Sequence, residues 1–461
     1  MKTLIAIILI SPGAWAAAPA VQDNPPSGAT NIPQAALRIP HSTNVLRLTP
    51  AYINELAEEM RVQHPALLAA RARTNAATQN VSAVRTWEDP VAHVGGMAAR
   101  EDLRASDGDV IYGVEQKLPL FGKPRLARRV AQAELGTEAA NADYQFQILR
   151  RELAKTAFRA ALADEVAAIG AQDLSWLDAL VQTLEDKYRA SQTTLAEVLQ
   201  VQNERDRRAN QLRTDRDLLG HERVSLNRIL NRKPDSSWPT LELPPLAGPV
   251  EYNERLVGFA LAYEPRIHVL RQQIKQAEAM ADLTRRQRLP DVSVGLEGRN
   301  YTGDGTFRQG VLVFSMGLPW ANAGKYRSDI YRDEARVRAT EFDLADYQLS
   351  LREEVHLLTI KIDAARRDAL LYRDDIIPRS ETALEAARAG WEANRNTLRD
   401  ILDARRMLLE GRLMSARAVS EQYQMLSELV LCCGVGDLEA LEMVGTIPEA
   451  QPQSKEKSNE K

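Results

Sequence analysis

The chain has 461 residues, of which 44% are hydrophobic, 26% are charged and only 5% are aromatic, and its formal net charge is −4. A chain without an excess of basic residues is a poor partner for nucleic acid. Its abundance of Ala, Leu, Arg and Glu favours long helices. After the N-terminal residues, no stretch contains the roughly 18 consecutive apolar residues of a transmembrane helix, so the sequence predicts no such helix.

The N-terminal residues form a processing signal rather than part of the fold. Residues 1–18 have the pattern of a signal peptide, with an apolar stretch at Leu4–Ile10 and small residues at Ala14–Ala16 or Ala16–Ala18 for cleavage. We therefore expect an exported protein. Residues 19–50 are rich in proline and show no periodicity, which indicates an extended arm.

A helix and a pair of strands follow the arm. Thr49 is a candidate N-cap for a helix that runs from Ala51 towards Trp87. Apolar and polar residues then alternate at Val91–Ala98 and Val110–Leu118, which predicts a strand hairpin with one apolar and one mixed face. Strands of this length approach the roughly 9–11 residues that cross a bilayer. A soluble hairpin buried on one side has the same alternation.

The next stretch is strongly helical. No proline occurs between Pro124 and Pro234, so a helix can continue over Gly122–Tyr188, a length of about 100 Å. A break at Ser191–Thr193 lets the chain return along a second helix to Asn231. Helices of this length are typical of coiled coils and tubes, because a compact globular core does not bury them.

The whole succession occurs twice. Leu118-Pro119 at the end of the strand hairpin returns as Leu318-Pro319. Thr194–Leu199 after the helical break returns as Thr397–Leu402, and His64-Pro65 is echoed by Glu264-Pro265. A period of about 200 residues is too long for a solenoid and indicates a duplicated half-molecule.

The second copy predicts the same elements as the first. Strands are expected at Val292–Leu296 and Val311–Leu318, followed by a helix over Gly324–Glu392 with a kink at Pro378. After a break at Asn394–Asn396 a last helix runs back. The seven-residue spacing of its apolar residues predicts a coiled-coil seam at Leu402, Leu409, Ala416, Tyr423 and Val430.

Two local motifs are interpreted as structure. At the junctions between strand and helix, Pro119 and Pro319 end the strands, while Gly122 and Gly324 allow a sharp turn. The charge-rich stretch Glu204–Arg208 is either a solvated face or a source of ion pairs between helices.

These elements predict a mostly α fold with a small β part, built on long helical hairpins. Four short strands do not close a barrel alone, since the smallest closed barrels need about eight, so any membrane-crossing sheet requires several chains. The expected segments are a signal peptide at 1–18, a Pro-rich arm at 19–50, a first repeat at 51–235, an inter-repeat segment at 236–263, a second repeat at 264–437 and a partly disordered tail at 438–461.

This layout resembles the TolC family of outer-membrane efflux channels over essentially the whole mature chain. The duplicated hairpins, the junction Leu118–Lys123 and the tip Asn396–Ala404 carry the resemblance. It implies a homotrimer whose twelve-stranded β-barrel in outer-membrane lipid continues into a periplasmic helical tube, with an equatorial belt formed by the segment around Asn231–Tyr263 and the C-terminal region. It also implies two partners, a periplasmic adaptor and an inner-membrane pump of the RND type. Tyr372–Arg379 is similar to the heavy-metal and cation branch of the family.

The resemblance places the periplasmic entrance at the helical turns. There Asp400 and Asp403, next to Arg399, would ring the aperture, since like carboxylates around a pore attract cations. The alternative is that both are solvated carboxylates near a helix N-terminus. Other residues of the two tips form either a seam between helices or a docking surface for the adaptor: Thr194, Leu195, Val198, Leu199, Thr397, Leu398, Ile401 and Leu402.

Nothing in the sequence indicates catalysis. The six histidines are scattered without the spacing of metal ligands, and no nucleophile motif or phosphate loop occurs, so we expect no enzyme, no metal site and no cofactor. Cys432 and Cys433 are better interpreted as buried small hydrophobes than as redox or metal ligands. The leading hypothesis is a passive efflux channel, with metal cations among its candidate substrates. The alternative is a periplasmic scaffold or adaptor of helical hairpins without a membrane barrel.

Overall fold

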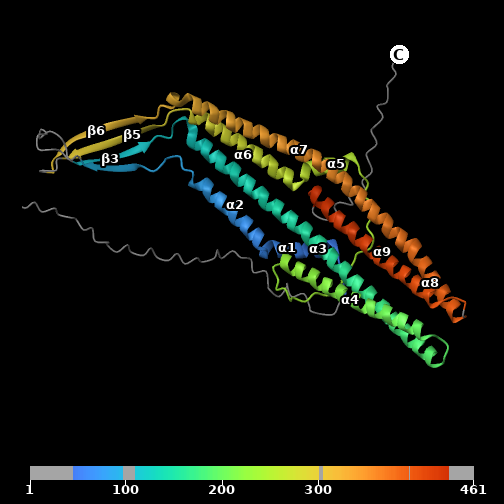
Figure 1. Ribbon diagram of the computed structural model, residues 1–461. Helices are drawn as coiled ribbons and strands as arrows, with labels where there is room; N and C mark the ends of the chain where they lie inside the picture. The colour runs from blue at the N-terminus through green and yellow to red at the C-terminus, as the bar shows by residue number, and fades with distance from the viewer. Residues whose placement is uncertain (1–44, 97–109, 301–304, 394, 436–461) are drawn as a thin grey trace, which may run out of the picture. The chain divides into compact units, whose positions relative to one another are not determined.

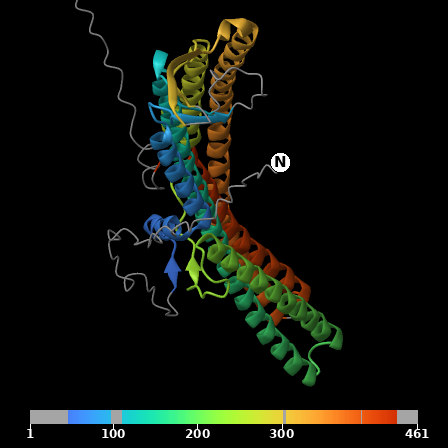
Figure 2. The ribbon, with the colours of Figure 1, turned by 90° about the vertical axis from the view of Figure 1, so that its left-hand side faces the viewer.

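The computed structural model describes residues 45–96, 110–300, 305–393 and 395–435. The predicted signal peptide, most of the Pro-rich arm, the loop of the first strand hairpin and the C-terminal tail lie outside these residues. Within them, both predicted copies of the strand hairpin and the helical hairpin are present, and the prediction of a mostly α fold with a small β part is confirmed (Figures 1 and 2).

The first repeat has two short helices, two strands and two long helices. Its elements are β1 (Leu46–Arg47), α1 (Pro50–Gln63), α2 (Pro65–Ala83), β2 (Val91–Gly96), β3 (Val110–Lys117), the 3₁₀ turn η2 (Leu120–Gly122), α3 (Lys123–Arg189) and α4 (Leu195–Ile229).

The second repeat follows the same order, with one extra break in its long helix. Its elements are β4 (Leu241–Glu242), α5 (Glu254–Tyr263), α6 (Pro265–Gln287), β5 (Val292–Asn300), β6 (Phe307–Met316), the 3₁₀ turn η3 (Pro319–Asn322), α7 (Ala323–Leu370), the π-helix η4 (Leu371–Ile376), α8 (Ile377–Glu392) and α9 (Leu398–Cys432).

The first predicted helix is in fact two. Thr49 caps α1 as expected, accepting the Tyr52 N–H at 3.2 Å. The chain then leaves the helical conformation at His64, because Pro65 disfavours it in the preceding residue. His64 Nδ1 accepts the Ala66 N–H at 3.2 Å and so starts α2. Glu264 has the same place in the second repeat, where burial raises the pKa of its carboxyl group.

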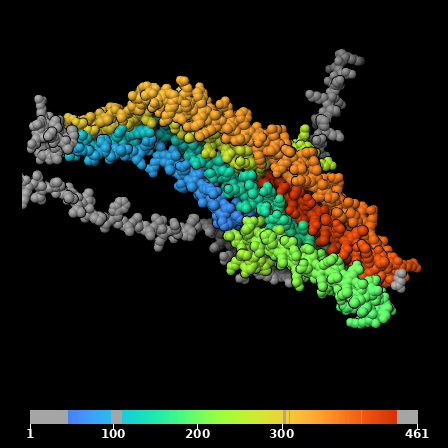
Figure 3. All heavy atoms as spheres, in the orientation of Figure 1, coloured from blue at the N-terminus to red at the C-terminus, as the bar shows by residue number. Residues whose placement is uncertain are grey.

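The four longer strands form one antiparallel sheet in the order β2-β3-β5-β6, while β1 and β4 form a separate parallel pair. The helices that continue from this sheet keep its order, because α2 packs on α3, α3 on α6, and α6 on α7. Figure 3 shows α2, α3 and α7 as successive bands of atoms. The edges of the sheet within the chain are therefore β2 and β6.

The two junctions between strand and helix differ. Phe121 and Gly122 both have positive φ, 59° and 72°, so the first junction turns as the glycine predicts. The second prediction was wrong, because Gly324 lies in the first turn of α7 and has no positive φ. Lys123 closes the first junction by donating to the Leu289 carbonyl at 2.6 Å and to Asp291 at 2.8 Å.

Each repeat has its own hydrophobic core. One cluster joins α1 to α3 around Met60 and Phe158, and a second joins α5, α7 and α9 around Ile362 and Leu429. Cys432 and Cys433 are free thiols in the second cluster, as predicted, and burial raises the pKa of the Cys433 thiol to about 12. They therefore behave as small apolar side chains.

The seven-residue seam predicted for α9 is only partly right. Leu402 is buried, but the other members are half-buried: Leu409, Ala416, Tyr423 and Val430. Buried positions recur every seven residues in another register, at Ile401, Leu408, Gln422 and Leu429.

Candidate functional site

The free ends of the two helical hairpins hold every residue predicted to act at an entrance. Both return helices start in the same way. In the first tip Thr194 Oγ1 accepts the Glu197 N–H at 3.4 Å, while the Glu197 carboxylate accepts the Thr194 N–H at 3.3 Å. In the second tip the Asp400 carboxylate accepts the N–H and the hydroxyl of Thr397, each at 2.8 Å.

Asp400 is therefore an N-terminal cap, as Glu197 is at the equivalent position of the first repeat. The backbone N–H of Thr397, followed by its hydroxyl, holds the pKa of Asp400 below its ordinary value. A carboxylate so engaged satisfies two donors at the start of α9. The interpretation of Asp400 as a carboxylate near a helix N-terminus thus has direct structural support.

Asp403 has a different environment. It lies on the exposed face of α9, with Arg399 Nε at 3.6 Å on one side and Arg406 Nη1 at 3.4 Å on the other. Arg406 also binds Glu204 of α4 through two bonds of 3.1 and 2.7 Å. The equivalent residue in the first repeat is the neutral Gln200. Asp403 is thus the carboxylate that distinguishes the second tip from the first.

The predicted docking residues fall into two sets. Val198, Leu398 and Leu402 are buried in one cluster with Leu177 and Leu184 of α3, so the two tips share a core. Ile401 is buried as well. The exposed members are Thr194, Leu195, Leu199 and Thr397. Sequence left the choice between seam and docking surface open, and the structure assigns four residues to packing within the chain.

Leu195 and Leu199 form the exposed apolar feature of the first tip. They lie one turn apart on α4 and are 51% and 49% exposed. Their counterparts in the second repeat are Leu398 and Leu402, which are buried against the first hairpin. An apolar pair is therefore available to a partner on one tip and used inside the chain on the other.

A buried ion group that sequence analysis missed joins the hairpins behind their tips. Asp173 of α3 is bound by Arg405 of α9 at 2.8 Å and by Arg208 of α4 at 3.5 Å, and all three side chains are largely buried. The Arg405 guanidinium also lies over the Trp176 ring, 4.9 Å from its centre. The stretch Glu204–Arg208 thus supplies ion pairs between helices, the second of the two interpretations above.

The opposite end of the helices carries the sheet, whose two faces differ. The register places Val114, Leu296, Leu312 and Phe314 on one face, and each is more than half exposed. The other face has serine and charged residues: Glu115 accepts from the Ser293 and Ser315 hydroxyls, and His93, Glu297 and Arg299 lie beside it. The predicted division into an apolar and a mixed face is confirmed.

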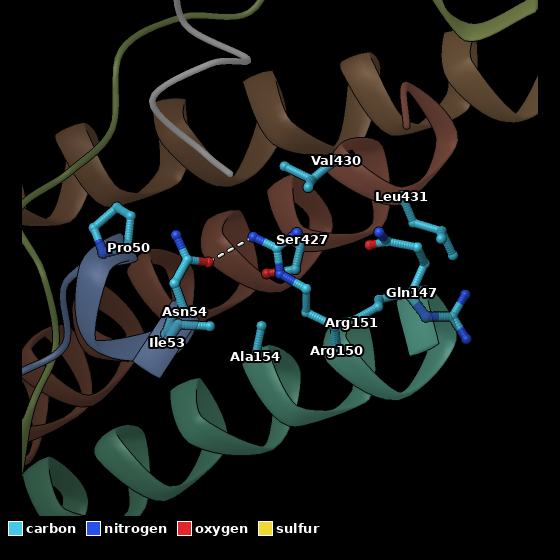
Figure 4. Close-up of a pocket in the computed structure, with 10 residues that line it drawn as sticks. All are labelled: Pro50, Ile53, Asn54, Gln147, Arg150, Arg151, Ala154, Ser427, Val430 and Leu431. Carbon is cyan, nitrogen blue, oxygen red and sulfur yellow. Dashed lines mark hydrogen bonds between the residues drawn. The ribbon is translucent and has the colours of Figure 1, made fainter. Parts of the chain in front are cut away.

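The small cavity between α1, α3 and α9 does not provide a substrate pocket. Its volume is about 40 Å³, against roughly 300–1,000 Å³ for typical ligand sites. Arg150 crosses it to donate to Asn54 Oδ1 at 2.5 Å, with Ser427 and Arg151 at its wall (Figure 4). The cavity is a joint between helices.

Over the described ranges, no group of three or more His, Cys, Asp or Glu side chains is placed to hold a metal ion. The helices of the same ranges include none that is long and apolar enough to cross a membrane.

Comparisons with known proteins agree with this architecture. Residues 256–435 match the family model described as outer membrane efflux protein. The cobalt-zinc-cadmium resistance protein CzcC of Cupriavidus metallidurans is 21% identical over 164 residues, which are 36% of this chain. The match spans 38% of the length of CzcC.

Three solved structures share the fold at low identity: the outer membrane protein VceC, CusC and the outer-membrane channel OprN. VceC from Vibrio cholerae has a TM-score of 0.71 at 18% identity, covering 84% of this chain and 97% of VceC. CusC has a TM-score of 0.72 at 13% identity, covering 86% and 97%. OprN has a TM-score of 0.72 at 17% identity, covering 84% and 90%.

Proposed function

We propose that this chain, whose residues 256–435 match the outer membrane efflux protein family, is the outer-membrane channel of a tripartite efflux system and acts as a passive trimeric conduit. The four-stranded sheet with an exposed apolar face is the observation that carries the proposal. Its edge strands β2 and β6 leave backbone groups unpaired within the chain, and in lipid such groups need partners.

Pairing between copies supplies those partners. If β2 of one copy pairs with β6 of the next, three copies provide twelve strands, above the roughly eight that a closed barrel needs. The apolar face then contacts lipid, and the face with Glu115 and Glu297 lines the lumen. Because α2, α3, α6 and α7 follow the order of the strands, the same contact continues the wall into the periplasm.

Cell fractionation tests this proposal. We expect the full chain in the outer-membrane fraction, as an oligomer that persists in mild detergent and forms conducting pores in planar bilayers. Recovery only from the soluble periplasmic fraction would overturn the proposal and favour a periplasmic scaffold.

For the aperture, we propose that the ring is formed by Asp403, with Arg399 beside it, rather than by Asp400. Asp403 is half exposed and has no acidic counterpart in the first repeat, whereas Asp400 is occupied as a cap. Three-fold symmetry around a narrow pore brings like carboxylates together and favours cations. We expect Asp403→Asn to weaken block of the reconstituted pore by divalent cations, and Gln200→Asp, its matched control on the first tip, to leave it unchanged. Equal block in wild type and Asp403→Asn would contradict the ring.

For the partners, we propose that a periplasmic adaptor contacts Leu195 and Leu199 and connects the channel to an inner-membrane pump of the RND type. The two exposed leucines support this, because exposed apolar residues on a helical turn suit the apolar face of another helix.

For the substrate, we propose metal cations, on the ground of the similarity to a protein described as a cobalt-zinc-cadmium resistance protein. Growth of a deletion strain on cobalt, zinc, cadmium, drugs and detergents, compared with growth of the same strain after complementation, tests this. Selective sensitivity to the metals supports the proposal, and sensitivity to drugs alone contradicts it.

A further inference from the structure

An open groove between α3 and α6, just below the sheet, is lined by five arginines: Arg125, Arg128, Arg129, Arg285 and Arg286. We call it the arginine groove. Its volume is about 1000 Å³, and Asp282 is the acidic residue of its lining. Asp282 pairs with Arg129 at 3.3 Å and with Arg285 at 3.0 Å.

The remaining arginines carry uncompensated charge. Arg125, Arg128 and Arg286 are exposed and form no ion pair with any residue that the structure describes. Arg285 is also held by Glu334 at 2.9 Å, which fixes one wall of the groove. The groove is therefore a basic surface with a defined wall and three guanidinium groups that form no ion pair. A guanidinium group binds phosphate well because it donates two parallel hydrogen bonds to two phosphate oxygens.

The groove lies on the same side of the molecule as the apolar face of the sheet. A second hollow, lined by Lys117, Lys123 and Asp291, lies on the other side of α3 and α6. Lys117 lies on the same face of the sheet as Glu115, and the two residues line one hollow on that face. The residues of the arginine groove lie on the opposite sides of both helices, so the groove is on the same side as Val114 and Leu296.

Exposed apolar and aromatic side chains lie at the level of the groove. Phe121, which lines it, is 45% exposed, and Trp320 of the second junction is 59% exposed. Leu318 is exposed as well, whereas Leu120 lines the second hollow. Aromatic residues between an apolar surface and a basic one are typical of the boundary between hydrocarbon and headgroups.

Assembly of several copies leaves the groove open. In the order α2-α3-α6-α7, the helices α3 and α6 are central, and a neighbouring copy meets the chain at its α2 and α7 edges. The groove is thus a surface within each chain and not a surface between copies. A ligand from the surroundings reaches it in any ring built through the sheet edges.

We propose that the arginine groove binds the headgroup of an anionic phospholipid from the periplasmic leaflet of the outer membrane, an inference that rests on the proposed membrane placement. The phosphodiester contacts Arg125, Arg128 and Arg286, and the acyl chains lie along the apolar face of the sheet above Phe121. One basic residue near an anionic membrane surface contributes enough for about a fivefold gain in affinity.

Native mass spectrometry of the full-length oligomer in neutral detergent measures this binding. Phosphatidylglycerol and phosphatidylcholine are added in parallel, and bound lipids are counted. We expect phosphatidylglycerol to bind at least tenfold more tightly. The variant Arg125→Gln/Arg128→Gln should lose most of that preference, because two phosphate ligands of each groove are removed without breaking an ion pair. The matched control Arg213→Gln/Arg216→Gln changes the same charge at the same spacing on exposed positions of α4 and should bind like wild type.

Three outcomes would overturn the inference. Equal binding of the two lipids, equal loss in the groove and control variants, or displacement of phosphatidylglycerol by millimolar inorganic phosphate would show that the groove does not select a lipid headgroup. Binding of an acidic peptide at the groove with no lipid preference would assign it to a protein partner instead. Recovery of the chain outside the outer membrane would contradict the proposed function, whereas an outer-membrane oligomer without lipid preference would contradict this inference alone.

Discussion

The two helical hairpins follow one plan but differ in their long helices. In the first, α3 continues for 67 residues without interruption. In the second, α7 ends at Leu370, a six-residue π-helix follows, and α8 starts with Pro378 in its first turn. Pro378 has no N–H to donate, and the wider π turn accommodates the missing bond. The first hairpin is a continuous rod, and the second has a joint along its length.

Contacts near the tips connect the second hairpin to the first. Asp173 and Arg208 of the first hairpin hold Arg405 of the second, and Leu398 and Leu402 pack among the leucines of α3. The second hairpin, which contains the π-helix, is thus held to the first hairpin near the tips. Separation of the two tips would therefore bend the second hairpin and break contacts of this shared core.

Removing the buried carboxylate should have the largest effect on this fastening. We expect Asp173→Asn to lower the free energy of unfolding by about 3–5 kcal/mol, because Arg208 and Arg405 would remain largely buried without a counter-charge. Chemical denaturation followed by circular dichroism measures it. The control Asp178→Asn removes the exposed partner of Arg205 and should cost at most about 1 kcal/mol. Similar costs for both would show that the tips are not fastened by the buried group.

Leucines at equivalent positions of the two tips should respond differently. Leu402→Ala removes a buried side chain from the shared core and should cost about 2–5 kcal/mol in denaturation. Leu199→Ala, at the half-exposed equivalent position, should change stability by less than about 0.5 kcal/mol.

Resistance assays separate stability from docking in the same pair. Leu199→Asp should abolish efflux-dependent resistance while the channel remains at its normal level in the outer membrane. Full resistance in that variant would remove Leu199 from the adaptor surface.

Much of this fold was predictable because its signals are local and repeated. The long helices, both strand hairpins and the cap Thr49 follow from periodicity, proline placement and short motifs. The split at His64 was missed, although Pro65 gave the signal. The π-helix was missed too, since Pro378 predicts a kink but not how the preceding turn absorbs it.

The roles at the tips depended on tertiary contacts and were less predictable. Leu195 and Leu398 look alike in sequence, but only the folded chain shows one exposed and the other buried. Asp173 gives no local signal, because its arginine partners lie on two other helices. The family resemblance assigns Asp400 and Asp403 to the same aperture ring. The position of Asp400, three residues after Thr397, already matches a capping box.

The joint in the second hairpin should be visible in hydrogen exchange. Amides of 371–376 should exchange about tenfold faster than those of 169–174 in α3, because a π turn has weaker bonds than a continuous helix. In Pro378→Ala the missing donor returns, so we expect the difference to shrink. Equal exchange of the two segments in the wild-type protein would show that the joint is as rigid as the rod.

The smallest expected effect is that of the cap at Asp400. The Thr397 N–H and hydroxyl hold the pKa of Asp400 below the ordinary 3.8 of an aspartate. The ionised cap therefore contributes stability above that value, and the contribution is lost as the pH falls through the lower pKa of the folded state. Protection factors of the amides in the first turn of α9, which correct for the intrinsic pH dependence of exchange, should fall over this acidic range in the wild type. In Asp400→Asn they should be lower at neutral pH and change less with acid. The exposed Asp403→Asn should behave like the wild type in this assay.

The two variants should therefore have opposite effects in the two assays. Asp400→Asn alters the helix end and leaves cation block unchanged, and Asp403→Asn does the reverse. Loss of cation block in Asp400→Asn, with hydrogen exchange of the first turn of α9 unchanged, would place Asp400 in the aperture ring and show that its cap does not stabilise the helix end.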